Sequence, residues 1–92
     1  MRRDGNEAGA NWKEIKTLEE FREIVRKNEG YIVITDIANT NKIHRPSCRW
    51  VREEYFEERV IKNKCRNGHY YWTNNIKFAQ KKWGAKVDPA CI

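Results

Sequence analysis

Hydrophobic and polar residues alternate along the chain with spacings that predict short helices and short strands. Leu18 and Val25 lie on one face of a helical pattern, and Thr17 and Glu20 have the spacing of a capping box. This pattern predicts a first helix over residues 17–29.

Two stretches have the composition of strands. Residues 31–35, Tyr-Ile-Val-Ile-Thr, are rich in β-branched side chains, and the polar cluster 39–41 predicts a turn before a short extended piece at 42–43. Farther on, Val60-Ile61 and residues 70–72 flank an Asn-Gly pair at 67 and 68, which is the strongest short signal for a hairpin turn. We therefore expect two β-hairpins.

A second helix is predicted between the hairpins. Pro46 suits its first position, Cys48, Val51 and Tyr55 share a face, and the pattern continues to about Glu58. These features place Cys48 in the first turn of a helix.

A third helix is predicted near the end of the chain. Asn74 can cap it, Ile76, Ala79 and Trp83 share a face, and Gly84 can end it. The fold class expected from all these elements is a small α+β domain with three helices and short antiparallel strands.

The chain of 92 residues is long enough for one domain only. We expect a flexible tail at 1–11 and a single domain at 12–92. A domain of this size buries a modest core, so we expect a bound zinc ion to stabilise it. The expected core residues are Leu18, Phe21, Val25, Ile32, Ile34, Val51, Tyr55, Ile61, Ile76, Ala79 and Trp83.

Charge is distributed unevenly along the chain. Residues 1–40 contain 7 Lys and Arg against 8 Asp and Glu, a net charge of −1, whereas residues 41–92 contain 12 against 5, a net charge of +7. A concentrated positive surface favours a partner made of phosphates, because each neutralised phosphate releases counterions. The alternative is that the charge serves only solubility.

No apolar run approaches the roughly 20 residues of a membrane span, and no secretory signal follows Arg2 and Arg3. We therefore expect a cytoplasmic, intracellular protein that does not enter a membrane.

The candidate metal ligands are all the cysteines and histidines of the chain. Three residues separate His44 from Cys48, a spacing at which one rigid turn presents two ligands to zinc. The same spacing separates Cys65 from His69, but a two-residue turn between them would place these side chains on opposite faces of a hairpin. We expect a Zn²⁺ site with four ligands drawn from His44, Cys48, Cys65, His69 and Cys91. The alternative is that Cys48 is a buried core thiol and Cys91 a free thiol.

Two parts of the chain resemble the Ada-type metal-binding domain. The first is residues 41–50, Asn-Lys-Ile-His-Arg-Pro-Ser-Cys-Arg-Trp, and the second is a later helix that ends in Gly, with a closing Pro-Ala-Cys at 89–91. That family includes the zinc module of the Ada DNA-repair methyltransferase and small Ada-like zinc modules attached to nucleases. The resemblance covers a little over a third of the chain.

In that family, a Cys-Arg-Pro-Ser-Cys or His-Arg-Pro-x-Cys segment supplies two ligands, and a Pro-Cys-x-x-Cys after the helix supplies two more. The resemblance implies that His44 and Cys48 are the first pair and Cys91 the third ligand, with Cys65 or His69 in place of a missing last cysteine. Ada proper transfers methyl groups to the first cysteine of its segment. That position is His44 here, and an imidazole is a far poorer nucleophile than a thiolate, so the resemblance implies a structural site rather than methyl transfer.

Cations and aromatic residues are interleaved around these candidates. Cations can contact phosphates while exposed rings stack on bases. We expect a zinc module that binds nucleic acid, DNA rather than RNA, and that is not an enzyme. The expected contact residues are Arg45, Arg49, Arg52, Lys62, Lys64, Arg66, Tyr71 and Trp72.

Two alternatives stay open. The acidic helix over 17–29 could contact a protein partner, as an adaptor in a nucleic-acid-processing complex would require. Alternatively, His44 or His69 could act as a general base beside Glu53 or Glu54 in a small nuclease.

Overall fold

The computed structural model describes residues 10–89, which form an α+β domain with three helices and a five-stranded mixed sheet. The strand order is β1-β4-β2-β3-β5, and only the β3–β5 pair is parallel. The strands are β1 (Trp12–Glu14), β2 (Tyr31–Ile34), β3 (Lys42–His44), β4 (Tyr70–Thr73) and β5 (Lys86–Val87). The helices are α1 (Leu18–Lys27), α2 (Glu53–Phe56), which continues directly into the π-helical segment η1 (Glu57–Lys62), and α3 (Ile76–Trp83).

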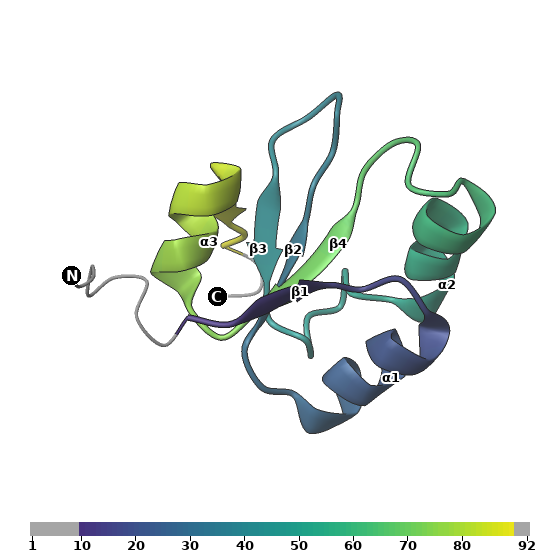
Figure 1. Cartoon of the computed structure of the whole chain (residues 1–92), viewed down its shortest axis with the longest axis horizontal. Coiled ribbons are helices and arrows are strands. Elements are labelled where there is room, and N and C mark those ends of the chain that lie inside the picture. The colour runs from purple at the N-terminus through teal and green to yellow at the C-terminus, as the bar shows by residue number, and fades with distance from the viewer. Residues whose placement is uncertain (1–9, 90–92) are drawn as a thin grey trace.

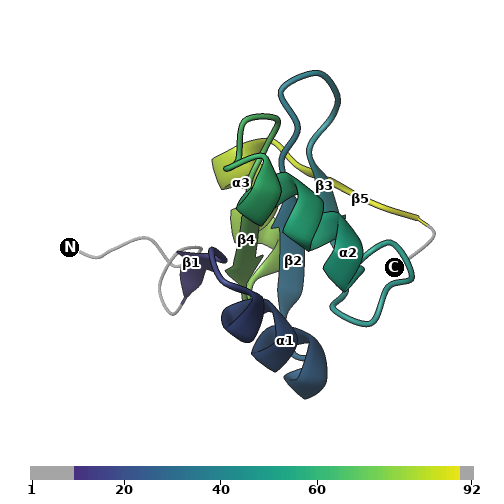
Figure 2. The same ribbon diagram turned by 90° about the vertical axis from the view of Figure 1, so that its right-hand side faces the viewer.

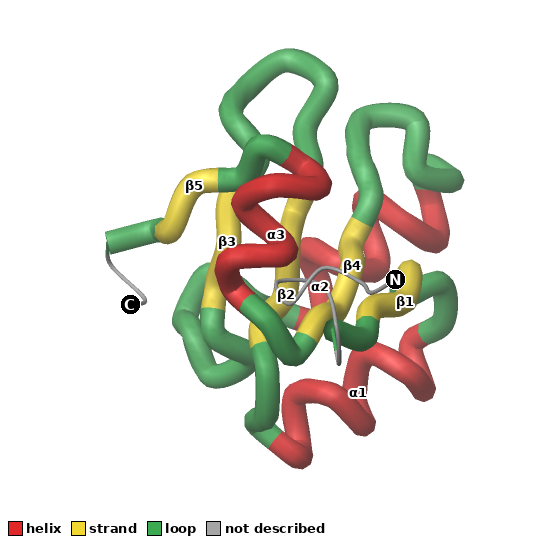
Figure 3. The backbone as a smooth tube through the Cα atoms, turned by 60° about the vertical axis from the view of Figure 1, so that its left-hand side comes forward, coloured by secondary structure: helices red, strands yellow, loops and turns green. Residues whose placement is uncertain are grey.

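The sheet lies between two helical layers. In Figure 1, α3 lies on one side of the strands and α1 and α2 lie on the other. Figure 2 shows α1 and α2 in front of the sheet, and Figure 3 shows α3 crossing the opposite face. None of the helices in the part of the chain that the structure describes is long and apolar enough to span a membrane.

Each face of the sheet has its own core. The helix-side core, under α1 and α2, consists of Ile15, Phe21, Ile24, Ile32, Val51, Phe56, Val60 and Tyr70. The α3-side core consists of Val33, Ile43, Ala79 and Ala85. Neighbouring residues of a strand point to opposite faces, so Ile32 and Val33 belong to different cores.

The first and third helices and the first hairpin confirm the sequence predictions. Thr17 and Glu20 form the predicted capping box of α1, which ends at Asn28 in a left-handed conformation. Gly84 ends α3, although the cap at its other end is Asn75 and not Asn74. Strands β2 and β3 form the first hairpin, with Val33 opposite Ile43.

The second predicted hairpin is wrong. Val60 and Ile61 lie in η1, where the Val60 side chain enters the helix-side core. Strand β4 pairs instead with β1 and β2. A Cβ at Gly68 would overlap the carbonyl oxygen of Thr35, so this glycine permits a close approach of two backbones and not a tight turn.

The predicted start of the second helix at Pro46 is also wrong. The helix begins at Glu53, and Pro46 is instead the second residue of a turn closed by the Cys48 amide on the Arg45 carbonyl (3.0 Å). The later start changes which residues face the core: Phe56 and Val60, four residues apart, are buried, whereas Tyr55 is 47% exposed. Ile61 is also exposed, because it lies on η1 and not in the predicted strand, so two of the expected core residues are surface residues.

Candidate metal and nucleic-acid sites

His44 and Cys48, the first predicted ligand pair, lie together. The Cys48 Sγ atom is 3.7 Å from His44 Nδ1. Strand pairing fixes His44 opposite Ile32 at the end of β3, and the turn with Pro46 brings Cys48 back toward it. Cys48 packs against the helix-side core.

A third potential ligand, Asp88, joins this pair. Its Oδ2 atom is 3.4 Å from His44 Nδ1. The parallel pairing of β5 with β3 carries Asp88 to this place, and the Asp88 amide donates to the Ile43 carbonyl at 3.1 Å. We call His44, Cys48 and Asp88 the inner cluster.

The inner cluster is shielded from solvent. The His44 side chain is 6% exposed and that of Asp88 is 16% exposed. Burial lowers the pKa of His44, although Asp88 opposes this effect. His44 is therefore neutral at pH 7, which is the form that binds metals.

The cysteines differ in oxidation state. Cys48 is disulfide-bonded, whereas Cys65 is a free thiol. A thiolate and not a disulfide sulfur is the metal ligand, so the inner cluster offers its sulfur to a metal only after reduction. Cys91, the remaining predicted ligand, lies outside the described residues.

Cys65 and His69, the second predicted pair, also lie together, because the hairpin that would have separated them does not form. Glu14 on β1 lies beside them, and one ligand atom from each of the three residues lies within 4.8 Å of the others. His69 Nδ1 is 2.6 Å from Glu14 Oε2. We call Glu14, Cys65 and His69 the edge cluster, since β1 is an edge strand.

The two clusters cannot share one ion. His44 is on β3 and His69 immediately precedes β4, with β2 between these strands, so they are roughly 10 Å apart across the sheet and a similar distance along it. His44 lies on the face of Ile32, whereas the His69 ring stacks with Tyr71 on the α3 side. The structure therefore does not bring Cys65 or His69 to His44 and Cys48.

The predicted nucleic-acid residues fall into three groups. Arg45, Arg49 and Arg52 are exposed on the segment that leads from β3 to α2. Arg49 lies over the Trp50 ring at 5.5 Å, and Arg52 over the Tyr55 ring at 5.7 Å. Arg52 also forms an ion pair with Glu54 (3.0 Å).

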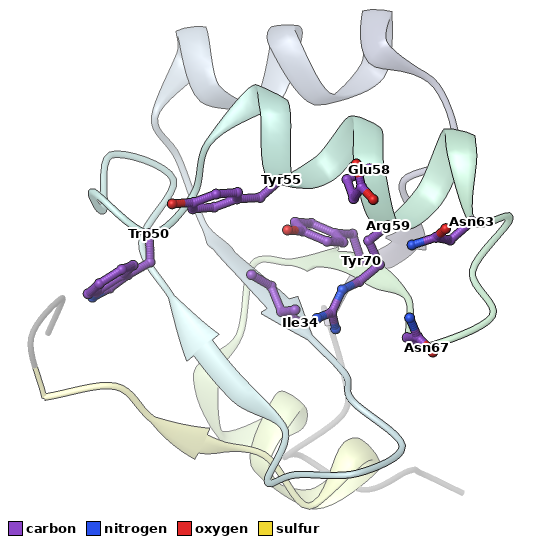
Figure 4. A pocket seen from close by; sticks show the side chains of 8 residues that line it. All are labelled: Ile34, Trp50, Tyr55, Glu58, Arg59, Asn63, Asn67 and Tyr70. Atoms are coloured by element: carbon purple, nitrogen blue, oxygen red, sulfur yellow. The ribbon is translucent and has the colours of Figure 1, made fainter.

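A second group, Lys62, Lys64 and Arg66, is exposed around the end of η1. A cleft of about 350 Å³ is lined by sequence neighbours of both groups and also by Glu58 and Arg59 (Figure 4). Trp50 and Tyr55 line one end of the cleft and Asn63 and Asn67 the other. Both aromatic rings are almost half exposed, at 46% and 47%.

The remaining predicted contacts, Tyr71 and Trp72, take part in internal packing. Tyr71 stacks on Trp83 at 4.8 Å on the α3 side. Trp72 packs against the helix-side core, and its indole NH donates to the Glu29 carbonyl at 2.9 Å. Because the two rings are only partly exposed and face opposite sides of the sheet, they do not form one stacking surface. Trp50 and Tyr55 are the exposed aromatic residues beside the arginines.

The structure gives little support to the two alternative functions. On α1, Glu23 forms ion pairs with Arg26 and Lys27, so the acidic face is partly neutralised. Glu53 accepts two hydrogen bonds from Arg22, and Glu54 pairs with Arg52. The carboxylate beside His69 is that of Glu14, which the sequence did not indicate.

Asp88 and Glu14 are the two site residues that the sequence analysis missed. A signal for Asp88 was present, since two residues separate it from Cys91, which is the spacing of the second ligand pair in Ada-type domains. Glu14 had no comparable signal, because only the β1–β4 pairing brings it to His69.

Comparison with known proteins identifies no relative: no protein-family model, curated protein sequence or solved structure matches this chain.

Proposed function

We propose that this chain is a zinc-binding module that binds nucleic acid, with DNA the first partner to test, along the cleft in Figure 4. One observation carries the proposal: the segment that begins with His44 and Cys48 continues directly into exposed arginines and two half-exposed aromatic rings.

The geometry of the inner cluster supports zinc binding there. Zinc bonds of about 2.0–2.3 Å at tetrahedral angles separate ligand atoms by roughly 3.3–3.8 Å. The distances from His44 Nδ1 to Cys48 Sγ and to Asp88 Oδ2, 3.7 and 3.4 Å, fall within this range. Imidazole, thiolate and carboxylate are all ligands that zinc accepts. The resemblance to Ada-type domains adds Cys91 as the proposed fourth ligand.

Zinc at this place would cross-link three segments. His44 ends β3, Cys48 belongs to the following turn, and Asp88 follows β5. Strand β5 has only two residues, so few backbone hydrogen bonds hold it. The proposed role of zinc is therefore structural: it holds the arginine segment in a fixed position.

The cleft and two exposed arginines outside its lining have features that favour a nucleic acid strand, although the Glu58 carboxylate also lines the cleft. Arg45 and Arg49 form no ion pair with any carboxylate among residues 10–89, so their charge is available to phosphates. Rings of Trp50 and Tyr55 offer faces for base stacking, which contributes about 1–3 kcal/mol per base. The Asn63 and Asn67 amides can donate and accept hydrogen bonds with base edges.

The test is fluorescence anisotropy with single-stranded and duplex DNA and with RNA, on reduced, zinc-loaded protein at several salt concentrations. We expect binding that weakens as salt rises. The double variant Arg45→Gln/Arg49→Gln should reduce the salt slope for a single strand by about 1.4, for two lost phosphate contacts.

The matched control is Arg26→Gln/Lys27→Gln, which removes the same charge from the exposed surface of α1. This control should change the slope much less. Undetectable binding at low salt, or an equal loss in both double variants, would refute the proposal.

A further inference from the structure

The edge cluster brings three different metal-binding groups together at one edge of the sheet. Glu14 comes from β1, Cys65 from the loop after η1, and His69 from the residue before β4. Their ligand atoms lie within 4.8 Å of one another, although 50 residues of sequence separate Glu14 from Cys65. Only tertiary structure makes this group.

Two of the three residues are held by the sheet. Glu14 is paired with Tyr71 across β1 and β4. Two hydrogen bonds with Thr35 fix the backbone of His69. The Thr35 amide donates to the His69 carbonyl at 2.9 Å, and the His69 amide donates to Thr35 Oγ1 at 2.8 Å. The imidazole and carboxylate are therefore positioned before any ion arrives.

Cys65 reaches the group through an unusual backbone. Lys64 and Cys65 both have positive φ angles, 53° and 62°. Left-handed conformations are uncommon outside glycine, and two in succession are strained. The Lys64 conformation is explained by the end of the helix, where the Cys65 amide donates to the Arg59 carbonyl at 3.0 Å. The second strained residue is the one that carries the thiol.

We propose that Glu14, Cys65 and His69 form a second metal site, separate from the inner cluster, for a divalent ion of the zinc class. A thiolate with an imidazole selects zinc or cobalt over magnesium and calcium, which prefer oxygen ligands. Three protein ligands leave one tetrahedral position for water, which is the arrangement of exchangeable and catalytic zinc sites and not of closed structural ones.

The surroundings of the edge cluster agree with an accessible ion. The three residues line an open pocket of about 340 Å³ together with Lys16, Val60 and Lys64. The His69 side chain is 42% exposed and that of Glu14 is 23% exposed, so solvent reaches the group. A thiolate and a carboxylate together neutralise a divalent cation, although Lys16 and Lys64 add positive charge to the same pocket.

Binding at this site requires loss of a proton. Burial, with a smaller contribution from Glu14, raises the pKa of the Cys65 thiol, whereas Lys16 lowers it. The thiol is therefore protonated at neutral pH in the absence of metal, and the arriving ion must displace this proton to solvent.

The experiment uses Co²⁺ as the probe and the full chain with Cys48→Ser and Cys91→Ser, so that Cys65 is the single remaining thiol. We expect a thiolate-to-cobalt charge-transfer band at one equivalent of Co²⁺, which disappears when Cys65→Ser is added. Glu14→Gln should weaken Co²⁺ binding by about tenfold or more, whereas Glu29→Gln, an exposed residue outside the cluster, should have no effect. A folded protein without the band would overturn the proposal.

A second measurement covers the case in which the double cysteine variant does not fold. Native mass spectrometry of the reduced wild-type chain and of Cys65→Ser then counts bound zinc ions. Cys65→Ser should bind one ion fewer than the wild type; equal counts would overturn the proposal. If His44→Gln loses zinc whereas Cys65→Ser keeps the wild-type count, the inner cluster binds zinc and the edge cluster does not. The two proposals can therefore fail separately.

Discussion

The inner and edge clusters contain similar side chains in different surroundings. His44, the last residue of β3, is buried beside Asp88, the residue after β5, and its side chain is 6% exposed. His69 stands at the β1 side of the sheet with 42% of its side chain exposed. An ion in the inner cluster would hold together segments that have few other contacts, whereas an ion in the edge cluster would add little to strands that already pair. We therefore expect the inner cluster to act as a structural site and the edge cluster as an exchangeable one.

The largest difference between the clusters should appear when zinc is removed. In zinc-finger peptides structural zinc contributes about 10–16 kcal/mol, against a total stability of about 5–15 kcal/mol for a typical domain. We expect chelation to unfold the reduced wild-type chain or lower its melting temperature steeply, as measured by circular dichroism. The same result is expected for His69→Gln, because the inner cluster is intact in that variant.

His44→Gln should start from low stability and respond little to the chelator. If chelation instead leaves the wild-type melting temperature unchanged, the inner cluster is not a structural zinc site.

Gly68→Ala should distinguish the clusters in the opposite way. The added Cβ would overlap the Thr35 carbonyl oxygen, so the backbone that positions His69 must shift. Such overpacking costs typically about 1–3 kcal/mol, occasionally more. We expect a lower free energy of unfolding in urea and weaker Co²⁺ binding at Cys65, with zinc at His44 retained.

Gly84→Ala is the control for Gly68→Ala. A Cβ there meets no atom, and the cost of its positive φ of 60° is about 1 kcal/mol. Equal destabilisation by both substitutions would show that the close approach of the Gly68 backbone to Thr35 does not exclude a side chain at position 68.

Tyr70 tests the helix-side core at a residue that is not itself a proposed ligand. Burial raises the pKa of Tyr70 to about 12 from its ordinary value of 10.0. The phenolate forms more readily in the unfolded chain, where the pKa is lower. The contribution of the buried, neutral Tyr70 to the free energy of unfolding is therefore complete below pH 10 and is lost as pH rises from 10 to 12. The loss is about 2–3 kcal/mol at 1.36 kcal/mol per pKa unit. Urea unfolding at several pH values should show this decline in the wild type and a shallower one in Tyr70→Phe; parallel declines would contradict the assignment.

The smallest expected effect is that of Glu14→Gln on the metal-free fold. The Glu14 carboxylate contacts His69 and Lys16 at the surface, and such ion pairs contribute at most about 1 kcal/mol. The free energy of unfolding should therefore change little while Co²⁺ affinity at the edge cluster falls. A large loss of stability would mean that Glu14 is primarily a structural residue.

Local signals in the sequence predicted the parts of the fold that local interactions determine. The capping box of Thr17 and Glu20 predicted α1, and the glycine at position 84 predicted the end of α3. The strands β1 and β5 were missed because they have three and two residues, too few to show a period. Val60 and Ile61 have β-branched side chains, but packing of Val60 in the helix-side core overrides that preference.

The ligand sets depend largely on pairings between strands that are distant in the sequence. The short spacing of His44 and Cys48 was sufficient to predict their contact, which the structure places at 3.7 Å. Asp88 reaches them only through the parallel β3–β5 pair, and Glu14 reaches His69 only through β1 and β4. The Asn-Gly pair at 67 and 68 suggested a hairpin because a close backbone approach and a tight turn both require glycine.

The most direct test of two separate sites is a count of zinc ions bound per chain, by native mass spectrometry of the reduced protein. Two ions are expected for the wild type, and one for each of His44→Gln and Cys65→Ser. In Cys65→Ser the remaining ion should be the one whose removal unfolds the chain. A single ion in the wild type that either substitution abolishes would contradict the account, because it would require ligands from both clusters to meet.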